Sequence, residues 1–295
     1  ESCATSIFNE PITALEFTSK TATLFPIELI ATTSDTTSKT TSVSHVIHTT
    51  NPEASKSIIV CATISSKGTL TVTVTAPTLS TTYSLWSLYI GSSNSGEPAA
   101  TVTIEFPSDT VLETATIQFE CGSLKWRGPN IVTKSFRSSI TLGETNLIAS
   151  PFQTKSLHAK TEKGSIKIAN ATVFVDAVLK TNFGGIDANI SGYKELSASL
   201  SMGELKAQLT NPTPGSQTTL FNSLGGLSAK VSGFEGLFET SVVVGKVFVL
   251  APGVKRGITG SGWHSGVVGD DENQATAAKI SAKSSLGSVL LEFVE

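Results

Sequence analysis

TEKGSIKIANATVFVDAVLKTNFGGIDANI, residues 161–190, holds two copies of one motif, and this motif determines the architecture. Its glycines are Gly164 and Gly184, and after each one every second residue is apolar, as at Ile166 and Ile168. The residues before each glycine alternate in the same way. Each copy therefore predicts a strand, a tight glycine-bearing turn and a second strand, with one face apolar.

The motif recurs through the C-terminal two thirds of the chain. Its glycines are Gly164, Gly184, Gly203, Gly225, Gly245, Gly266 and Gly287, with weaker copies at Gly122 and Gly143. One unit cannot bury its apolar face alone, but stacked units form a continuous core. We therefore expect a β-solenoid with rungs of about 20 residues over about 111–295. A meander of antiparallel hairpins remains the alternative, because the same turns close hairpins.

The repeats resemble those of a known family. The copies TEKGSIKI, TNFGGIDA and SSLGSVLL, at 161–168, 181–188 and 284–291, are similar to rungs of the putative-adhesin β-solenoid family. That family includes bacterial head-domain and fungal extracellular proteins of unknown function. The resemblance covers only about 111–295, and it weakens at Gly266, where WHSGVV lacks the usual preceding strand. It implies a cell-surface location and an adhesive or structural role.

Residues 1–110 have a different character, since 42 of them are Ser or Thr. Short alternating runs predict a β-sandwich-like domain here, with an N-terminal arm. In TLTVTVTA, residues 69–76, the apolar and hydroxyl side chains fall on opposite faces, and Ser65–Gly68 predicts a hairpin loop before it. The Thr/Ser-rich segment Ser34–Ser44 predicts an exposed loop. The expected strands are 12–19, 24–32, 57–65, 69–76, 84–90 and 100–106.

The composition argues against several functional classes. Charged residues make up 15% of the chain and the net charge is -3, without a basic patch, so nucleic-acid binding is not expected. No apolar run is long enough for a transmembrane segment. The chain begins at Glu1 rather than Met, which predicts a processed, secreted protein.

Secretion would expose the chain to disulfide formation and glycosylation. Cys3, Cys61 and Cys121 are the disulfide candidates, and their odd number leaves one over, with Cys3 as the expected intersubunit cross-link. Three buried, reduced cysteines are the alternative. Asn170 and Asn189 lie in acceptable N-glycosylation sequons.

No arrangement of residues predicts catalysis. The sequence lacks a phosphate loop, a nucleophile elbow and a metalloprotease motif, so we expect no enzyme, no cofactor and no metal site. His45 and His48 fall on opposite faces of a strand, and Asp270–Glu272 has the character of a turn. Tyr83, Trp86 and Tyr89 are close enough in sequence to stack on sugar rings, although such clusters more often belong to a core.

These observations together predict an extracellular structural or adhesive protein. A solenoid without polar caps would expose open sheet edges, which accept added strands. The N-terminal arm, through Ile7, Phe8, Ile12 and Leu15, would add a strand to a neighbouring copy and build a homopolymer or surface layer. The alternative is a monomeric carbohydrate-binding module that recognises cell-surface glycans.

Overall fold

The computed structural model describes residues 6–20, 26–34, 39–48, 58–75, 100–149, 151–251, 254–260, 262–269 and 277–294. All regular elements in these ranges are β-strands, which confirms the all-β prediction. No helix in the described part of the chain is long and apolar enough to cross a membrane. The chain divides into two compact units, Glu1–Ala149 (unit 1) and Ser150–Glu295 (unit 2).

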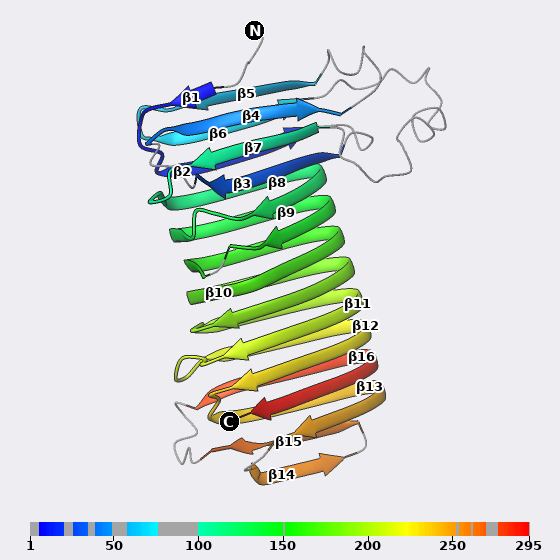
Figure 1. Cartoon of the computed structure of the whole chain (residues 1–295). Coiled ribbons are helices and arrows are strands. Elements are labelled where there is room, and N and C mark those ends of the chain that lie inside the picture. Colours follow the sequence, from blue (N-terminus) through cyan, green and yellow to red (C-terminus); the bar gives the residue numbers. More distant parts are fainter. Residues whose placement is uncertain are drawn as a thin grey trace, which may run out of the picture. The chain divides into compact units, whose positions relative to one another are not determined.

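Unit 2 consists of long, bent strands that lie side by side (Figure 1). Neighbouring strands pair in parallel and in register, glycine beside glycine. This pairing is that of a solenoid and rules out the antiparallel meander for these rungs. The rungs are β10 (Phe152–Ser191, which spans two bends), β11 (Glu195–Thr210), β12 (Gln217–Ser232), β13 (Gly236–Leu250) and β16 (Ala278–Val294).

Each rung bends at its repeat glycine. At Gly225 the φ angle is 130°, and a Cβ atom would lie 1.9 Å from the carbonyl oxygen of Gly203 in the neighbouring rung. The bend is therefore a change of direction within a continuous strand, at a point where the backbones of two neighbouring rungs come close together. It is not the tight turn expected from the sequence. The buried Asn222 stabilises it, because its Nδ2 donates to the carbonyl oxygens of Gly203 (3.0 Å) and Gly226 (2.9 Å).

The bend divides every rung into two halves, which build two walls. We call the half before the glycine the first wall and the half after it the second wall. Alternate side chains of both walls point into the interior, and in β12 these are at most 3% exposed. Removing this apolar surface from water is the main stabilising term. The buried apolar residues of β12 are Leu220, Leu227, Ala229 and Val231.

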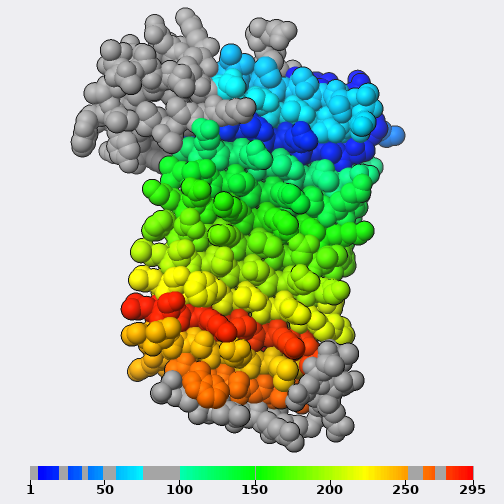
Figure 2. Space-filling view, turned by 180° about the vertical axis from the view of Figure 1, so that it is seen from behind, coloured from blue at the N-terminus to red at the C-terminus, as the bar shows by residue number. Residues whose placement is uncertain are grey.

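The last rung in the sequence is not the last rung in space. β16 pairs with β12 on one side and with β13 on the other. Figure 2 shows the red band of β16 between the yellow β12 and the orange β13. Successive repeats therefore do not stack in chain order at this end of unit 2.

Two antiparallel strands extend the first wall beyond β13. They are β15 (Trp263–Val268) and β14 (Val254–Gly260). β15 pairs with the first-wall half of β13, from Gly236↔Val268 to Ser241↔Trp263, and β14 pairs with β15. Gly266 lies within β15 and not at a bend, so the predicted repeat at Gly266 is not a rung. This explains why WHSGVV lacks the strand that precedes the other copies.

Unit 1 contains two further rungs, β8 (Val111–Trp126) and β9 (Ile131–Leu147), which bend at Gly122 and Gly143. The first-wall half of β8 pairs with β2 (Ala14–Lys20), and its second-wall half pairs with β3 (Ile27–Thr33). Both pairings are parallel. Residues of the predicted N-terminal domain therefore continue the walls of the first rungs.

The other strands of unit 1 extend these walls. The first wall continues from β2 to β6 (Thr69–Thr75) and β5 (Ile59–Ile64). The second wall continues from β3 to β7 (Ala100–Phe106), β4 (Thr41–Ile47) and β1 (Ser6–Phe8). A separate sandwich-like domain over residues 1–110 is not confirmed, and the boundary at 110 remains a prediction.

Several local predictions for unit 1 are confirmed. Leu70, Val72 and Val74 of β6 are fully buried, and the hairpin loop closes with Gly68 at a φ of 76°. The predicted loop at Ser34–Ser44 is wrong in its second part, because β4 begins at Thr41. The predicted strand at 84–90 lies outside the described residues.

Candidate functional site

A groove crosses the outer face of the first wall near the end of unit 2. It is lined by β12, β16, β13 and β15 and has a volume of about 730 Å³. The strand registers place four polar side chains in a row across it: Thr219, Ser281, Glu239 and Ser265. Since neighbouring strands lie about 4.8 Å apart, this row is about 14 Å long.

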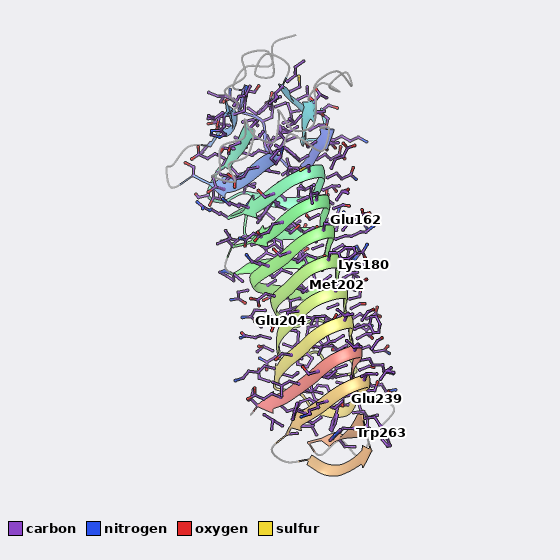
Figure 3. The ribbon with its side chains drawn as sticks, turned by 90° about the vertical axis from the view of Figure 1, so that its right-hand side faces the viewer. Glu162, Lys180, Met202, Glu204, Glu239 and Trp263 are labelled. Atoms are coloured by element: carbon purple, nitrogen blue, oxygen red, sulfur yellow. The ribbon has the colours of Figure 1, made fainter. Side chains whose placement is uncertain are left out.

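Two aromatic side chains mark the ends of the next row. This row runs through Phe221, Lys283, Ser241 and Trp263. Phe221 is 39% exposed and Trp263 is 42% exposed, so each presents part of its ring to solvent. Figure 3 shows Trp263 and Glu239 on the same side of the ribbon.

One ion pair holds a carboxylate of the groove lining. Lys283 Nζ is 2.9 Å from Glu239 Oε1, and both side chains are about half exposed. Such a pair adds little to stability, but it neutralises the carboxylate and restricts its position. Lys279, Gln217 and Leu237 also line the groove. The groove therefore combines apolar faces, hydroxyl groups, an amide and a nearly balanced set of charges.

An open sheet edge lies at the same end of unit 2, on the second wall. The first-wall half of β13 pairs on both sides, with β16 and β15. The rest of β13, Val243–Leu250, contains the bend at Gly245 and the second-wall half, and it pairs with β16 alone among the described residues. We call this segment the β13 edge. Its exposed apolar side chains are Val243 (82%), Val244 (59%), Phe248 (51%) and Leu250 (56%).

The interior is also incomplete at this edge. Val247 and Val249 occupy the positions that Val289 and Leu291 hold in β16. Val289 and Leu291 are fully buried, whereas Val247 and Val249 are only half-buried. One further strand beside β13 would cover them.

A cluster on β10 contains the residue types of a catalytic triad without its geometry. Ser156 Oγ donates to Asp176 Oδ1 at 2.5 Å, and His158 Nε2 contacts Asp176 Oδ2. The hydroxyl therefore bonds to the carboxylate and not to the imidazole, so the base that a serine nucleophile needs is not in place. We interpret the cluster as a polar network between neighbouring rungs.

The N-terminal arm residues have different environments. Ile7 is 67% exposed and Phe8 is half-buried, whereas Ile12 is 6% exposed and Leu15 is fully buried. Leu15 lies in β2, between β6 and β8. Ile12 and Leu15 thus belong to the core of their own unit, and only the first part of the arm is accessible to a neighbour.

The remaining candidates are only partly described. Cys121 is a buried free cysteine, and desolvation raises the pKa of its thiol. Asn170 is exposed and Asn189 is half-buried, both on β10. The described residues contain no group of three metal-binding side chains. Cys3, Tyr83, Trp86, Tyr89 and Asp270–Glu272 lie outside the described residues.

The sequence predicted neither the groove beside Trp263 nor the β13 edge as a site. Trp263 lies in the one motif copy that lacked its preceding strand, and this irregularity was the available signal. The β13 edge depends on β16 lying between β12 and β13, which no spacing in the sequence reports.

The chain is similar to several known proteins. A family model described as Toastrack DUF4097 matches residues 16–219. No curated protein matches. Among solved structures, a putative adhesin from Bacteroides fragilis is 12% identical, with 97% of this chain and 95% of that chain covered and a TM-score of 0.40. A putative cell adhesion protein from Clostridium sporogenes is 8% identical, with 98% of this chain and 99% of that chain covered and a TM-score of 0.26. A putative lipid binding protein from Parabacteroides distasonis is 10% identical, with 100% of this chain and 97% of that chain covered and a TM-score of 0.25.

Proposed function

Since the chain belongs to the Toastrack DUF4097 family, we propose that it is a non-catalytic adhesive protein of the cell surface that assembles head to tail through its sheet edges. The family membership supports the comparison with adhesin-like proteins made from the repeats. The extracellular location is supported by the Ser/Thr-rich composition and by the two sequons. The assembly is supported by the geometry of the described edges.

The β13 edge is the observation that carries the assembly. A strand with a free edge presents backbone N–H and C=O groups that an extended peptide can satisfy. The apolar side chains of this edge favour a partner strand that is also apolar. The only charge in the segment is Lys246. Natural edges that must remain unpaired usually carry more protection than one lysine.

Unit 1 also has open strands on its second wall. In the described part of unit 1, four strands extend the second wall beyond β8, and three extend the first wall. In the described part of unit 2, two strands extend the first wall beyond β13, and none extends the second. In the described residues, the second wall is therefore the longer wall of unit 1 and the shorter wall of unit 2. Open strands of the second wall on both units suit a head-to-tail contact between copies.

The chemistry of the two edges is compatible. The outer strands of the second wall in unit 1 are β1 and β4, whose residues SIF and TSVSHVI carry no Lys, Arg, Asp or Glu. Ile7 and Val46 are 67% and 58% exposed there. Pairing β1 or β4 with the β13 edge of a second copy would place apolar side chains together without opposing like charges. Head-to-tail contacts of this kind build open filaments.

Assembly can be tested with charges placed on the β13 edge. We expect the full-length protein to form filaments in negative-stain electron microscopy and to elute as large species in size-exclusion chromatography. The double variant Val244→Lys/Phe248→Lys should be monomeric, because it replaces two apolar side chains of the edge with charged ones, and lysines on a free edge oppose strand addition.

Met202→Lys is the matched control. Met202 is 45% exposed, but its rung is paired on both sides, with Phe183 and Leu224 as neighbours. This variant should assemble like the wild type. Uniform monomers of the wild-type protein at all accessible concentrations would contradict the assembly proposal and would favour the monomeric carbohydrate-binding module.

A further inference from the structure

We propose that the groove beside Trp263 is a binding site for a carbohydrate chain. The proposal concerns the ligand of the adhesive function. The groove lies on first-wall halves of the rungs, whereas the β13 edge lies on the second wall. The site therefore does not depend on assembly, and both surfaces can be occupied at once.

The aromatic residues provide the first part of the argument. Sugar rings have apolar C–H faces and polar edges, so they are bound by side chains that combine a flat apolar surface with nearby hydrogen-bonding groups. Trp263 and Phe221 are both partly exposed and stand three strands apart in one row. By the strand spacing they are about 14 Å apart, which is farther than one monosaccharide reaches. The spacing therefore favours a chain of sugars over a single one.

The polar lining provides the second part. The row of Thr219, Ser281, Glu239 and Ser265 runs beside the aromatic row and presents three hydroxyl groups and a carboxylate. Hydroxyl and carboxylate oxygens can accept hydrogen bonds from sugar hydroxyls, and hydroxyl groups can also donate to them. Gln217 adds an amide, which does both. These donors and acceptors match the edge of a pyranose ring.

The charges argue against the main alternative ligands. Glu239 is paired with Lys283, so Lys279 is the remaining charge in the lining. One lysine is too little for a nucleic acid or another polyanion. One paired carboxylate is too little for a calcium ion, which takes six to eight oxygen ligands. The open, elongated groove is likewise unlike an enclosed cavity for a small apolar molecule.

The site can be tested by affinity gel electrophoresis of the full-length protein. Native gels would contain laminarin, hydroxyethyl cellulose, mannan or polygalacturonate, each at graded concentration. We expect at least one polysaccharide to retard the wild-type protein. Trp263→Ala should weaken this binding about tenfold or more, which corresponds to about 1.4 kcal/mol. Thr219→Arg should abolish the binding of the polysaccharide, because the larger side chain would fill the groove.

A control variant and a salt control make the result specific. Trp86→Ala should leave the retardation unchanged, and a loss with this variant but not with Trp263→Ala would overturn the assignment. Retardation that disappears in 0.5 M NaCl and persists in Trp263→Ala would show binding through lysines alone and would also overturn it. The absence of retardation by all four polysaccharides would contradict the proposal.

Failure of this site can be distinguished from failure of assembly. Trp263→Ala should retain the far-ultraviolet circular dichroism of the wild type and should still form filaments. Val244→Lys/Phe248→Lys should remain monomeric and should still be retarded by the same polysaccharide. If the edge variant loses retardation while it remains folded, sugar binding depends on polymer formation and the groove alone is not the site.

Discussion

The two adjacent glycines at the bend of β12 have different structural requirements. Gly225 has a φ of 130°, and a Cβ atom there would meet the Gly203 carbonyl oxygen at 1.9 Å. Gly226 has no such φ, and its nearest neighbour would be Glu204 Cγ at 4.0 Å. The first glycine is therefore fixed by close contact between rungs, whereas the second occupies open space.

We expect Gly225→Ala and Gly226→Ala to differ sharply in stability. Gly225→Ala should lower the free energy of unfolding by about 3 kcal/mol or more, because backbone strain and steric overlap combine. Gly226→Ala should change it by about 1 kcal/mol or less. Urea unfolding followed by circular dichroism would measure both. Equal effects of the two substitutions would show that the bend accommodates a side chain.

Tyr193 predicts a loss of stability at alkaline pH. Burial raises the pKa of Tyr193 to about 12, against a smaller lowering by the hydrogen bond from Thr218. In the unfolded chain the Tyr193 hydroxyl ionises near pH 10. The contribution of its burial to the free energy of unfolding is therefore complete below pH 10 and is lost as pH rises towards 12. The loss should be about 1.4 kcal/mol per pH unit over this window. In Tyr193→Phe, this part of the pH dependence should disappear from urea unfolding curves.

The cysteines predict a specific disulfide. Cys121 is free and buried, and its raised pKa makes it a poor nucleophile. If one disulfide forms on secretion, Cys3 and Cys61 are the remaining pair, and Cys121 takes the place of Cys3 as the cysteine left over. Peptide mapping without reduction should therefore link Cys3 to Cys61, and Cys121 should be alkylated only after unfolding. A linked peptide that contains Cys121 would contradict this assignment.

At the level of elements, the position of β16 has a measurable consequence. Because β16 pairs on both sides, its amides should exchange slowly with deuterium although it is the last strand in the sequence. The β13 edge precedes it in sequence but is paired on one side only, so its amides should exchange faster. Hydrogen-exchange mass spectrometry of the monomeric edge variant would compare the two. Faster exchange in β16 would contradict the observed strand order.

The elements that the sequence predicts are those specified by local pattern. Alternation placed β6 and β7 correctly, and the glycine spacing gave the bends from Gly122 to Gly245 and at Gly287. These features depend on residues close together in the chain. β4 was missed in part because its Thr- and Ser-rich start also fits a loop, and composition alone cannot separate the two.

The order of the rungs could not be predicted in the same way. Gly225, Gly245 and Gly287 belong to rungs that all bury aliphatic residues at equivalent positions. Any of these rungs could therefore pack beside any other, and the spacing does not distinguish between the possible orders. The groove at Trp263 depends on this order, because its lining comes from β12, β16, β13 and β15. The candidate site therefore follows from long-range pairing, which a single sequence does not encode as a local pattern.

At the level of the whole molecule, the assembly proposal makes a prediction about symmetry. A contact between the β13 edges of two copies would be isologous and would stop at a dimer, whereas a contact between β13 and the outer strands of unit 1 would be heterologous and would continue. Val46→Lys places a charge on β4 of unit 1, and Val244→Lys/Phe248→Lys places charges on the β13 edge. In the heterologous arrangement, each variant alone should be monomeric.

Mixing the two variants then distinguishes the arrangements. The edge variant keeps an intact unit 1 strand, and Val46→Lys keeps an intact β13 edge, so one copy of each can form a single contact. The mixture should therefore give one-to-one heterodimers, with no longer species, in analytical ultracentrifugation. A homodimer of Val46→Lys alone would indicate that β13 edges pair with each other. Each monomeric variant keeps one intact edge, which can bind to a filament end and stop its growth. In the heterodimer both intact edges are already paired, so the heterodimer should slow the growth of wild-type filaments less than either monomeric variant does.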